Sequence, residues 1–334
     1  MSISYQTYGP RRPYLSWRSN RIMRFLVLSM TLSLLISCAG DYPPVDKNRN
    51  IDLQGHRGAR GDRPENTWAA FKFALENGIT TLELDTVMTA DQTIIIHHDT
   101  VLNPKICQYS GGQELKPAPI LATNYADIKE LDCGIPQLDR FPEQKSAEET
   151  QLLTLAQFFT LIDQWKKANN NPTLLFNIEI KLDIEPKPDP KLIRKNTEAF
   201  IKVVKDANQV PNTTIQSFVH EVLLEAEKIE PDLKRSALIW PSRFEVIKLK
   251  IGLTDAVYQS AIDMAKSHKA QIISPYYMYV DREFVHRANE AQLEVIPWTI
   301  NEVEDITAMY ETGVQGVISD YPLRMKKALE IYRN

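Results

Sequence analysis

The sequence predicts an α/β fold, a (β/α)8 TIM barrel with an inserted lobe after its second strand hairpin. Strand-like and amphipathic helix-like runs alternate from residue 51 onward, which is typical of parallel strands joined by crossover helices. Eight such units fit a chain of 334 residues. Residues 103–150 interrupt the alternation with glycine, proline and charged residues of little period. We therefore assign residues 51–334 to one barrel domain and residues 103–150 to an insertion that shapes specificity.

The composition indicates a globular protein whose main partner is not a nucleic acid. Hydrophobic residues make up 43% of the chain, enough to form a large core. The net charge is −4, and no basic stretch is interleaved with aromatic residues. These features argue against nucleic acid as the main partner, and the sequence leaves the oligomeric state open.

The first 38 residues have the pattern of a secretory signal. Several arginines precede the apolar run FLVLSMTLSLLIS, which is too short for an ordinary membrane span and ends in LISC. LISC resembles a bacterial lipobox, and this resemblance implies cleavage before Cys38 and a lipid on its thiol; an uncleaved anchor is the alternative. Residues 39–50 are polar and contain two prolines, as expected of a tether. From this resemblance we expect a lipid-anchored periplasmic protein. The outer membrane is favoured because Ala39, rather than aspartate, follows the cysteine.

Two cysteines, Cys107 and Cys133, remain after such processing. In an oxidising compartment an even pair can form a disulfide. This one would close a loop of about 25 residues and stabilise the fold by roughly 3–4 kcal/mol. Two unpaired cysteines, one or both buried, are the alternative.

Eight runs carry the strand pattern of the predicted barrel. Amphipathic helices lie between most of them, such as NTWAAFKFALENG, which ends at Gly78, and EDITAMYETG, which ends at Gly313. The strands are expected at residues 51–54, 80–88, 173–181, 213–218, 235–240, 270–275, 294–300 and 314–319.

A further strand-like run, TIIIHHD at residues 93–99, follows residues 80–88 too closely for a crossover helix. The two runs are therefore expected to pair antiparallel. If Asp91 and Gln92 form the turn, His98 lies opposite Asp85. By alternation the neighbouring His97 then faces away from the site, and we expect a structural role for it.

Charged side chains gather at the predicted carboxyl ends of the strands, where barrels of this type carry their functional groups. Glu83 and Asp85 share one face of their strand, as do Glu179 and Lys181, because strand side chains alternate. Three carboxylates facing one cavity repel one another, so the expected cofactor is one hard divalent cation, Ca²⁺ or Mg²⁺. Alternatively, Glu83 and Asp85 could line an exposed strand face, and Glu179 and Lys181 could form a plain ion pair.

Basic side chains complete a site for a phosphodiester. Arg57 and Lys181 suit an anionic substrate, so a phosphate bridging the cation and these bases is the natural guest. His56 and His98 can act as base and acid, because the ordinary histidine pKa lies near 6.5. The glycines of the segment GHRG, residues 55–58, would let the backbone turn sharply and let a phosphate approach closely.

The segments HRGARGDRPENT, ELD, HHD, NIEIK, SF, WTIN and GVISDYP follow one another as in glycerophosphodiester phosphodiesterases, a family that the chain resembles over about residues 51–330. The resemblance implies hydrolysis of glycerophosphodiesters to sn-glycerol 3-phosphate and an alcohol, with Ca²⁺ or Mg²⁺. It also implies roles for ten residues: catalysis by His56 and His98, metal binding by Glu83, Asp85 and Glu179, phosphate binding by Arg57 and Lys181, support by Glu65 and Asn66, and contact with the glycerol end by Trp298.

Some positions depart from that family or have a plainer explanation. Gln92 stands where the family turn commonly has glycine, and Ser319 stands where threonine is usual. Asp320 is expected only to order a turn at a strand end. Glu65 could cap the helix that starts near Asn66, and the Trp298 ring could be ordinary core packing.

Two other functions stay open at this point. One is a phospholipase C or D-like activity on intact lipids, which would use the same acid–base logic. The other is a surface lipoprotein that binds a partner and has little activity. The sequence also leaves open which histidine is the acid, and whether water or a glycerol hydroxyl is the nucleophile.

Overall fold

The computed structural model describes residues 42–170 and 174–334, and Tyr42–Asn334 form one compact unit. The predicted signal, with Cys38, and the first residues of the predicted tether lie outside the described residues. In the part of the chain that is described, no helix has the length and apolar character needed to cross a membrane.

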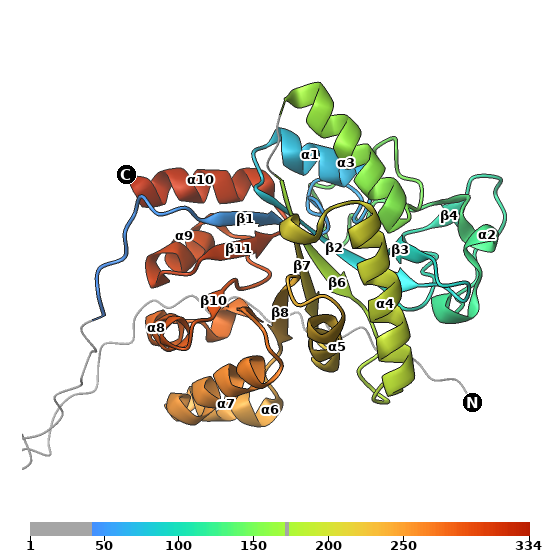
Figure 1. The fold of residues 1–334 in the computed structure, drawn as a ribbon. Coiled ribbons are helices and arrows are strands. Elements are labelled where there is room, and N and C mark those ends of the chain that lie inside the picture. The colour runs from blue at the N-terminus through green and yellow to red at the C-terminus, as the bar shows by residue number, and fades with distance from the viewer. Residues whose placement is uncertain (1–41, 171–173) are drawn as a thin grey trace, which may run out of the picture. The chain divides into compact units, whose positions relative to one another are not determined.

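Eight parallel strands form a nearly closed barrel, which confirms the predicted fold class (Figure 1). The barrel closes where Gln315 donates its backbone N–H to the carbonyl of Val295 at 3.0 Å and Ile318 donates to Pro297 at 3.0 Å. Around the barrel the strands are β10 (Glu294–Val295), β9 (Ile272–Pro275), β8 (Lys234–Ile239), β7 (Thr213–Ser217), β6 (Leu175–Ile180), β2 (Thr81–Met88), β1 (Asp52–Gly55) and β11 (Gly316–Ser319).

Helices surround the strands and bury their apolar faces against them. In α3, a capping box of Thr154 and Gln157 fixes the first turn. The rings of Phe158 and Phe159 then pack on Phe176 of β6 at centroid distances of 5.7 and 5.3 Å, and burying such rings contributes about 1.5–3 kcal/mol each. The helices after residue 50 are α1 (Trp68–Glu76), α2 (Tyr125–Ile128), α3 (Leu155–Asn169), α4 (Pro190–Asp206), α5 (Glu221–Ile229), α6 (Arg243–Lys250), α7 (Thr254–Ser267), α8 (Arg282–Glu290), α9 (Val303–Thr312) and α10 (Pro322–Arg333).

The hairpin of β2 with β3 (Ile94–Ile96) is antiparallel, as predicted, but its register differs by one residue. Thr86 lies opposite Ile96, and the carbonyl of Asp85 accepts from the backbone N–H of His97, so the predicted pairing of Asp85 with His98 is wrong. The reason is the loop, which contains residues 90–92 rather than two residues. Its last residue, Gln92, adopts a φ of 64°, the left-handed position of a three-residue hairpin loop.

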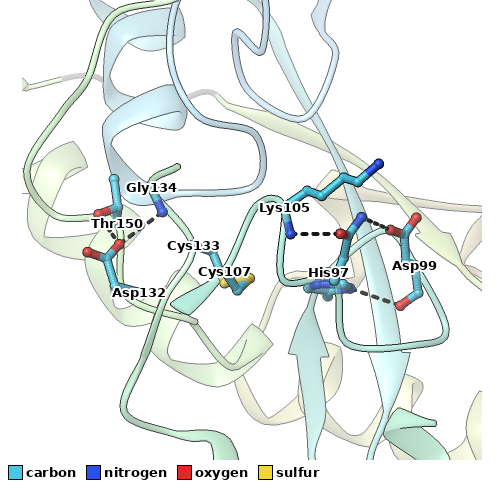
Figure 2. Close-up of a disulfide and its surroundings, with 9 residues drawn as sticks. His97, Asp99, Lys105, Cys107, Asp132, Cys133, Gly134 and Thr150 are labelled. Carbon is cyan, nitrogen blue, oxygen red and sulfur yellow. Dashed lines mark hydrogen bonds between the residues drawn. A yellow bond between two sulfur atoms is a disulfide. The ribbon is translucent and has the colours of Figure 1, made fainter. Parts of the chain in front are cut away.

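The inserted lobe has a small core of its own. It contains β4 (Gln108–Tyr109), paired antiparallel with β5 (Leu131–Asp132), and α2. A disulfide joins Cys107 to Cys133 beside this pair (Figure 2). The lobe core includes Val87 of β2 and Ile95 of β3, so the lobe is packed onto the hairpin.

One predicted strand is much shorter than expected. The run 294–300 forms a strand only over Glu294–Val295, with one isolated bridge from Trp298 to Tyr276. The residues that follow run along the rim of the barrel and carry Trp298 and Asn301 there. These residues still form hydrogen bonds to the neighbouring strands, since Trp298 donates its backbone N–H to the carbonyl of Pro275 and Ile300 donates to that of Ile318.

Candidate active site

The turn after β1 places two basic side chains at the rim of the barrel. Arg57 has a φ of 50° and Gly58 a φ of 82°. A Cβ on Gly55 would lie 2.2 Å from the carbonyl oxygen of Gly58, and one on Gly58 would lie 2.7 Å from backbone carbon of Ala70. Glycine is therefore required here by the tightness of the turn and its contact with α1.

Three carboxylates meet in the barrel beside this turn. Glu83 and Asp85 come from β2 and Glu179 from the paired strand β6, where Glu179 lies opposite Asp85. All three are buried, and each offers an oxygen within 4.8 Å of the others. Lys181 pairs with Glu179 at 2.8 Å and with Asp85 at 3.3 Å.

Burial makes these charges costly, and the cluster titrates unevenly. Burial, with the charge of Asp85, raises the pKa of Glu83 well above its ordinary value. Burial also raises the pKa of Glu179 to about 7 against the pull of Lys181. Burial alone would raise the pKa of Asp85 too, but Lys181 and Arg57 outweigh it and hold that pKa well below normal. A hard divalent cation fits this donor set, because it would replace the protons that the raised pKa values retain.

Arg57 is held by carboxylates on several sides. Its backbone N–H donates to Glu83 Oε2 at 2.8 Å, its Nη1 donates to Glu65 Oε1 at 2.7 Å, and its Nε lies 3.1 Å from Asp85 Oδ2. Asn66 donates to the same Asp85 oxygen at 3.0 Å. The segment with Glu65 and Asn66 therefore fixes both the guanidinium and the carboxylate.

His56 points its two ring nitrogens at different partners. Nδ1 lies 2.6 Å from Asp320 Oδ1, and Nε2 lies 3.9 Å from Glu83 Oε2. Because an ionised carboxylate only accepts, Nδ1 carries the proton and Nε2 keeps its lone pair toward the carboxylates. Burial, then the charge of Arg60, lowers the pKa of His56 to about 3, although Asp320 opposes the shift.

Asp320 does more than order a strand end, contrary to our expectation. It follows β11, and its Oδ1 also accepts from Arg60 Nε at 2.6 Å while its Oδ2 accepts from Asn301 at 2.7 Å. Sequence reasoning left Asp320 and Arg60 out of the site. The available signal was position, since Asp320 directly follows the last strand at the rim where His56 follows the first.

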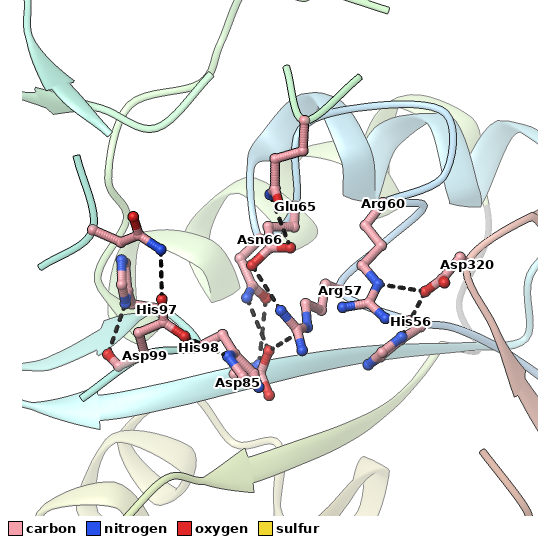
Figure 3. A network of polar contacts seen from close by, with 12 residues as sticks. His56, Arg57, Arg60, Glu65, Asn66, Asp85, His97, His98, Asp99 and Asp320 are labelled. Atoms are coloured by element: carbon pink, nitrogen blue, oxygen red, sulfur yellow. Dashed lines mark hydrogen bonds and ion pairs between the residues drawn. The ribbon is translucent and has the colours of Figure 1, made fainter. Parts of the chain in front are cut away.

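His98 reaches the site from the other side, out of the hairpin. Figure 3 shows Arg57 and Asp85 lying between His98 and His56. Nδ1 of His98 lies 2.8 Å from Asp99 Oδ1, and Asn103 holds the other Asp99 oxygen at 2.8 Å. Burial, then Arg57 and Lys181, lowers the pKa of His98 to about 4.

His97 is turned toward the inserted lobe. Its Nδ1 lies 2.8 Å from the carbonyl oxygen of Asp99, and its ring lines a small cavity with Cys133 and Leu152. Its position agrees with a structural role.

A second polar layer supports the carboxylates from inside the barrel. Gln216 of β7 donates to Glu83 Oε1 at 2.8 Å, and Asn177 of β6 donates to Gln216 at 3.1 Å and to Gln54 of β1 at 2.7 Å. Sequence reasoning missed these amides. Their signal was a polar side chain two residues before Glu179 on the same strand face.

Comparison of the sequence with known families assigns the chain to one of them. Residues 56–324 match the profile of the "Glycerophosphoryl diester phosphodiesterase family". The chain belongs to this family. It is therefore a phosphoric diester hydrolase, as the sequence predicted.

Relatives of this family resemble the chain over most of its length. A glycerophosphodiester phosphodiesterase of Caldanaerobacter subterraneus subsp. tengcongensis is 30% identical over 80% of this chain and 93% of its own. The crystal structure of a putative glycerophosphoryl diester phosphodiesterase from Silicibacter pomeroyi has a TM-score of 0.73, 29% identity, and covers 87% of this chain and 95% of its own. A phosphodiesterase of Oleispira antarctica, solved with the product sn-glycerol-3-phosphate, shares the fold at a TM-score of 0.63 and 22% identity, covering 84% of this chain and 97% of its own.

Aromatic side chains border the phosphodiesterase site beside Lys181. Trp298 donates its indole N–H to the carbonyl of Ser274 at 2.7 Å, which fixes the ring. Its ring lies 5.4 Å from that of Phe218, 5.6 Å from that of Trp240 and 5.8 Å from that of Tyr276. Lys181 Nζ lies 5.8 Å from the Phe218 ring, so this aromatic group adjoins the basic part of the site.

Proposed function

We propose that this chain hydrolyses glycerophosphodiesters to sn-glycerol 3-phosphate and an alcohol, with His56 and His98 exchanging protons beside a divalent cation. One observation carries the proposal. Three buried carboxylates offer oxygens within 4.8 Å of one another, and His56 Nε2 lies 3.9 Å from the Glu83 carboxylate of this cluster.

The residues that would hold the cation are Glu83, Asp85 and Glu179. When bound, Ca²⁺ or Mg²⁺ would neutralise charge on the phosphate oxygens. Arg57 and Lys181 supply further positive charge at the same place, and their carboxylate partners orient them before the substrate arrives.

Proton transfer needs one neutral ring as base and one protonated ring as acid. Burial holds both rings neutral near pH 7 before substrate binds, and the negative phosphate of the substrate would favour the protonated form of the ring that acts as acid. One removes the proton of the nucleophile, and the other protonates the alkoxide that leaves. Asp320 and Asp99 each fix the tautomer of one ring by accepting from its Nδ1, so each ring presents Nε2 for the transfer. The nucleophile is water or the glycerol hydroxyl next to the phosphate; the second choice passes through a cyclic phosphate.

The test is release of sn-glycerol 3-phosphate from glycerophosphocholine, with and without a chelator, followed by return of Mg²⁺ or Ca²⁺. We expect release that stops with chelator and returns with one of these ions. His56→Ala is the control for a contaminating hydrolase. Release that ignores the chelator would remove the cation from the proposal, and no release from any glycerophosphodiester would favour the binding lipoprotein.

We also propose that the mature chain begins at Cys38 and carries a lipid there, in the periplasm. The support is the LISC segment, together with the disulfide of Cys107 and Cys133, which suits an oxidising compartment. Radiolabelled palmitate should enter the wild-type chain in bacterial cells and not the Cys38→Ala variant. Equal labelling of both chains would contradict the anchor.

A further inference from the structure

The rim of the barrel after β8 and β9 exposes large apolar side chains. Helix α6 follows β8 directly and contains no buried residue. Phe244 is 78% exposed, Ile247 55% and Ile251, at the helix C-cap, 65%. Their spacing of three and four residues puts them on one face of the helix. Together with nearby exposed side chains they form what we call the apolar rim: Trp240, Phe244, Ile247, Ile251, Leu253 and Met278.

The apolar rim borders the site. Trp240 directly follows β8, and its ring contacts those of Tyr276 and Trp298 at centroid distances of 4.7 and 5.6 Å. Met278 lies between β9 and α8. These residues therefore lie at the carboxyl end of the barrel, where Lys181 and Glu179 also lie.

The structure of α6 suggests contact with a medium that is less polar than water. A capping box of Ser242 and Glu245 fixes its first turn, and Leu249 is only partly buried against the core. A helix this short gains little stability from its own hydrogen bonds and normally relies on packing. Here the most apolar face is 55–78% exposed, so an apolar surface outside the unit would complete the packing.

Charge on α6 indicates which apolar surface this is. The helix carries Arg243, Lys248 and Lys250 against Glu245, three positive charges and one negative, whereas the whole chain has a net charge of −4. Cations beside an apolar stripe are typical of helices that lie in a bilayer interface, where lysine and arginine reach the lipid phosphates.

The path of the chain toward the N-terminus supports the same surface. The carbonyls of Tyr42 and Pro43 accept from Arg282, the first residue of α8, at 3.2 and 2.8 Å. Because α8 follows the carboxyl end of β9 closely, Tyr42 is held near the apolar rim. The four residues from Cys38 to Tyr42 span at most about 14 Å. A lipid on Cys38 would thus tether this end of the barrel to the bilayer.

We propose that the apolar rim is a membrane-docking surface that seats on a phospholipid bilayer and holds the mouth of the site at the level of the head groups. The partner is the lipid surface itself. Docking would let the site meet phosphodiesters held at or released from that surface.

Vesicle flotation tests this surface. Tyr42–Asn334 form one compact unit with a nearly closed barrel, so the chain can be studied from Tyr42 onward, without the apolar N-terminal run that would bind vesicles by itself. The probe is a vesicle of phosphatidylcholine with phosphatidylglycerol. We expect Phe244→Ser/Ile247→Ser/Ile251→Ser to lower the partition coefficient by about tenfold or more, and high salt or omission of phosphatidylglycerol to weaken wild-type binding.

Matched controls separate docking from general stickiness. Leu175→Ser/Ile331→Ser removes two apolar side chains that are 39% and 50% exposed elsewhere on the unit, and it should float like the wild type. Each variant should keep cooperative thermal unfolding and the wild-type rate on a soluble glycerophosphodiester. Flotation does not depend on turnover, so an inactive chain would still decide the question.

Three results would overturn the docking surface. The first is a wild-type unit that does not float. The second is a rim variant that floats as well as the wild type. The third is a wild-type unit that forms dimers in sedimentation while the rim variant stays monomeric and neither binds vesicles, because the rim would then join two copies of the chain.

Discussion

The two halves of the barrel rim differ in the kind of side chain they carry and in its exposure to water. The half formed by β11, β1, β2 and β6 buries charged side chains against one another, with Asp85 and Asp320 each only 1% exposed. The half formed by β8, β9 and β10 presents aromatic and aliphatic side chains, of which Trp240 is 61% exposed. Charges stabilise a reacting phosphate most when water is excluded and their positions are fixed in advance, whereas apolar contact needs only area. Chemistry and contact are therefore separated along one rim.

Removing the cation should damage the charged half most. A chelator should lower turnover of glycerophosphocholine by about 10³-fold or more, because a metal supplies several kcal/mol of stabilisation to a phosphoryl transition state. The assay is release of sn-glycerol 3-phosphate, with Trp298→Ala as a chain whose aromatic half is altered. If both chains kept their rates with chelator, the carboxylates would have another purpose.

Removing the cation should also change how the stability of the fold depends on pH. Without a cation the folded chain keeps a proton on Glu179 up to a pKa of about 7, whereas the ordinary value is 4.5. Stability from this proton is complete below the ordinary pKa of 4.5 and is lost progressively as pH rises to the folded value, so this contribution to the melting temperature should fall between about pH 4.5 and pH 7. Added Mg²⁺ or Ca²⁺ should cancel the fall, since the cation competes with that proton. Glu179→Gln should lack the fall altogether.

The histidines act in the opposite direction over much of the same pH range, so the contribution of Glu179 is read from the difference between the wild type and Glu179→Gln. His56 and His98 have folded pKa values of about 3 and about 4, below the ordinary 6.5. As pH falls through 6.5 the unfolded chain gains protons that the folded chain refuses, so this part of the stability decreases toward acid pH.

Loss of either histidine should come next in size. His56→Ala and His98→Ala should each lower kcat by on the order of 10²-fold or more, the usual contribution of general acid–base catalysis. Circular dichroism should show an intact barrel for both. A near-wild-type rate would remove that residue from the reaction, and His97→Ala, at the neighbouring position, should leave the rate close to normal.

Asp320→Asn should have an intermediate effect. The amide cannot balance Arg60, so the pKa of His56 should fall further and kcat should drop by about tenfold or more. The acid limb of the kcat/KM profile should move to lower pH. Asp99→Asn is the matched change at His98, and its effect should be smaller because the Asp99 side chain is 38% exposed. An unshifted acid limb in Asp320→Asn would show that His56 does not set it.

The aromatic half should give the smallest change. Trp298→Ala should raise KM by roughly 5–10-fold with little change in kcat, because it removes contact made equally with substrate and transition state. Trp240→Ala, one ring farther out, should change KM less. A large loss of kcat in Trp298→Ala would mean that the two halves share the chemistry.

The sequence predicted most of the barrel because its strands repeat a simple pattern, and it placed the site residues because period-two alternation sets their faces. It failed where local geometry decides. Gln92 in a left-handed conformation lengthens the hairpin loop and shifts the register by one residue, which no alternation pattern records. The partnership of Asp320 with His56 joins the first strand to the last, and only closure of the barrel brings them together. The exposed face of α6 had no signal at all, since Phe244 and Ile247 read like any amphipathic helix until their burial is known.

The β2–β3 hairpin contributes side chains to two different parts of the molecule. Glu83 and Asp85 on β2 belong to the site, whereas Val87 two residues farther along, with Ile95 on β3, belongs to the core of the inserted lobe. His98 leaves the same hairpin. The lobe could therefore be rebuilt during evolution, and the approach to His98 with it, while the ring of parallel strands is inherited unchanged. Substrate preference and the hydrolytic machinery can diverge at different speeds in such a chain.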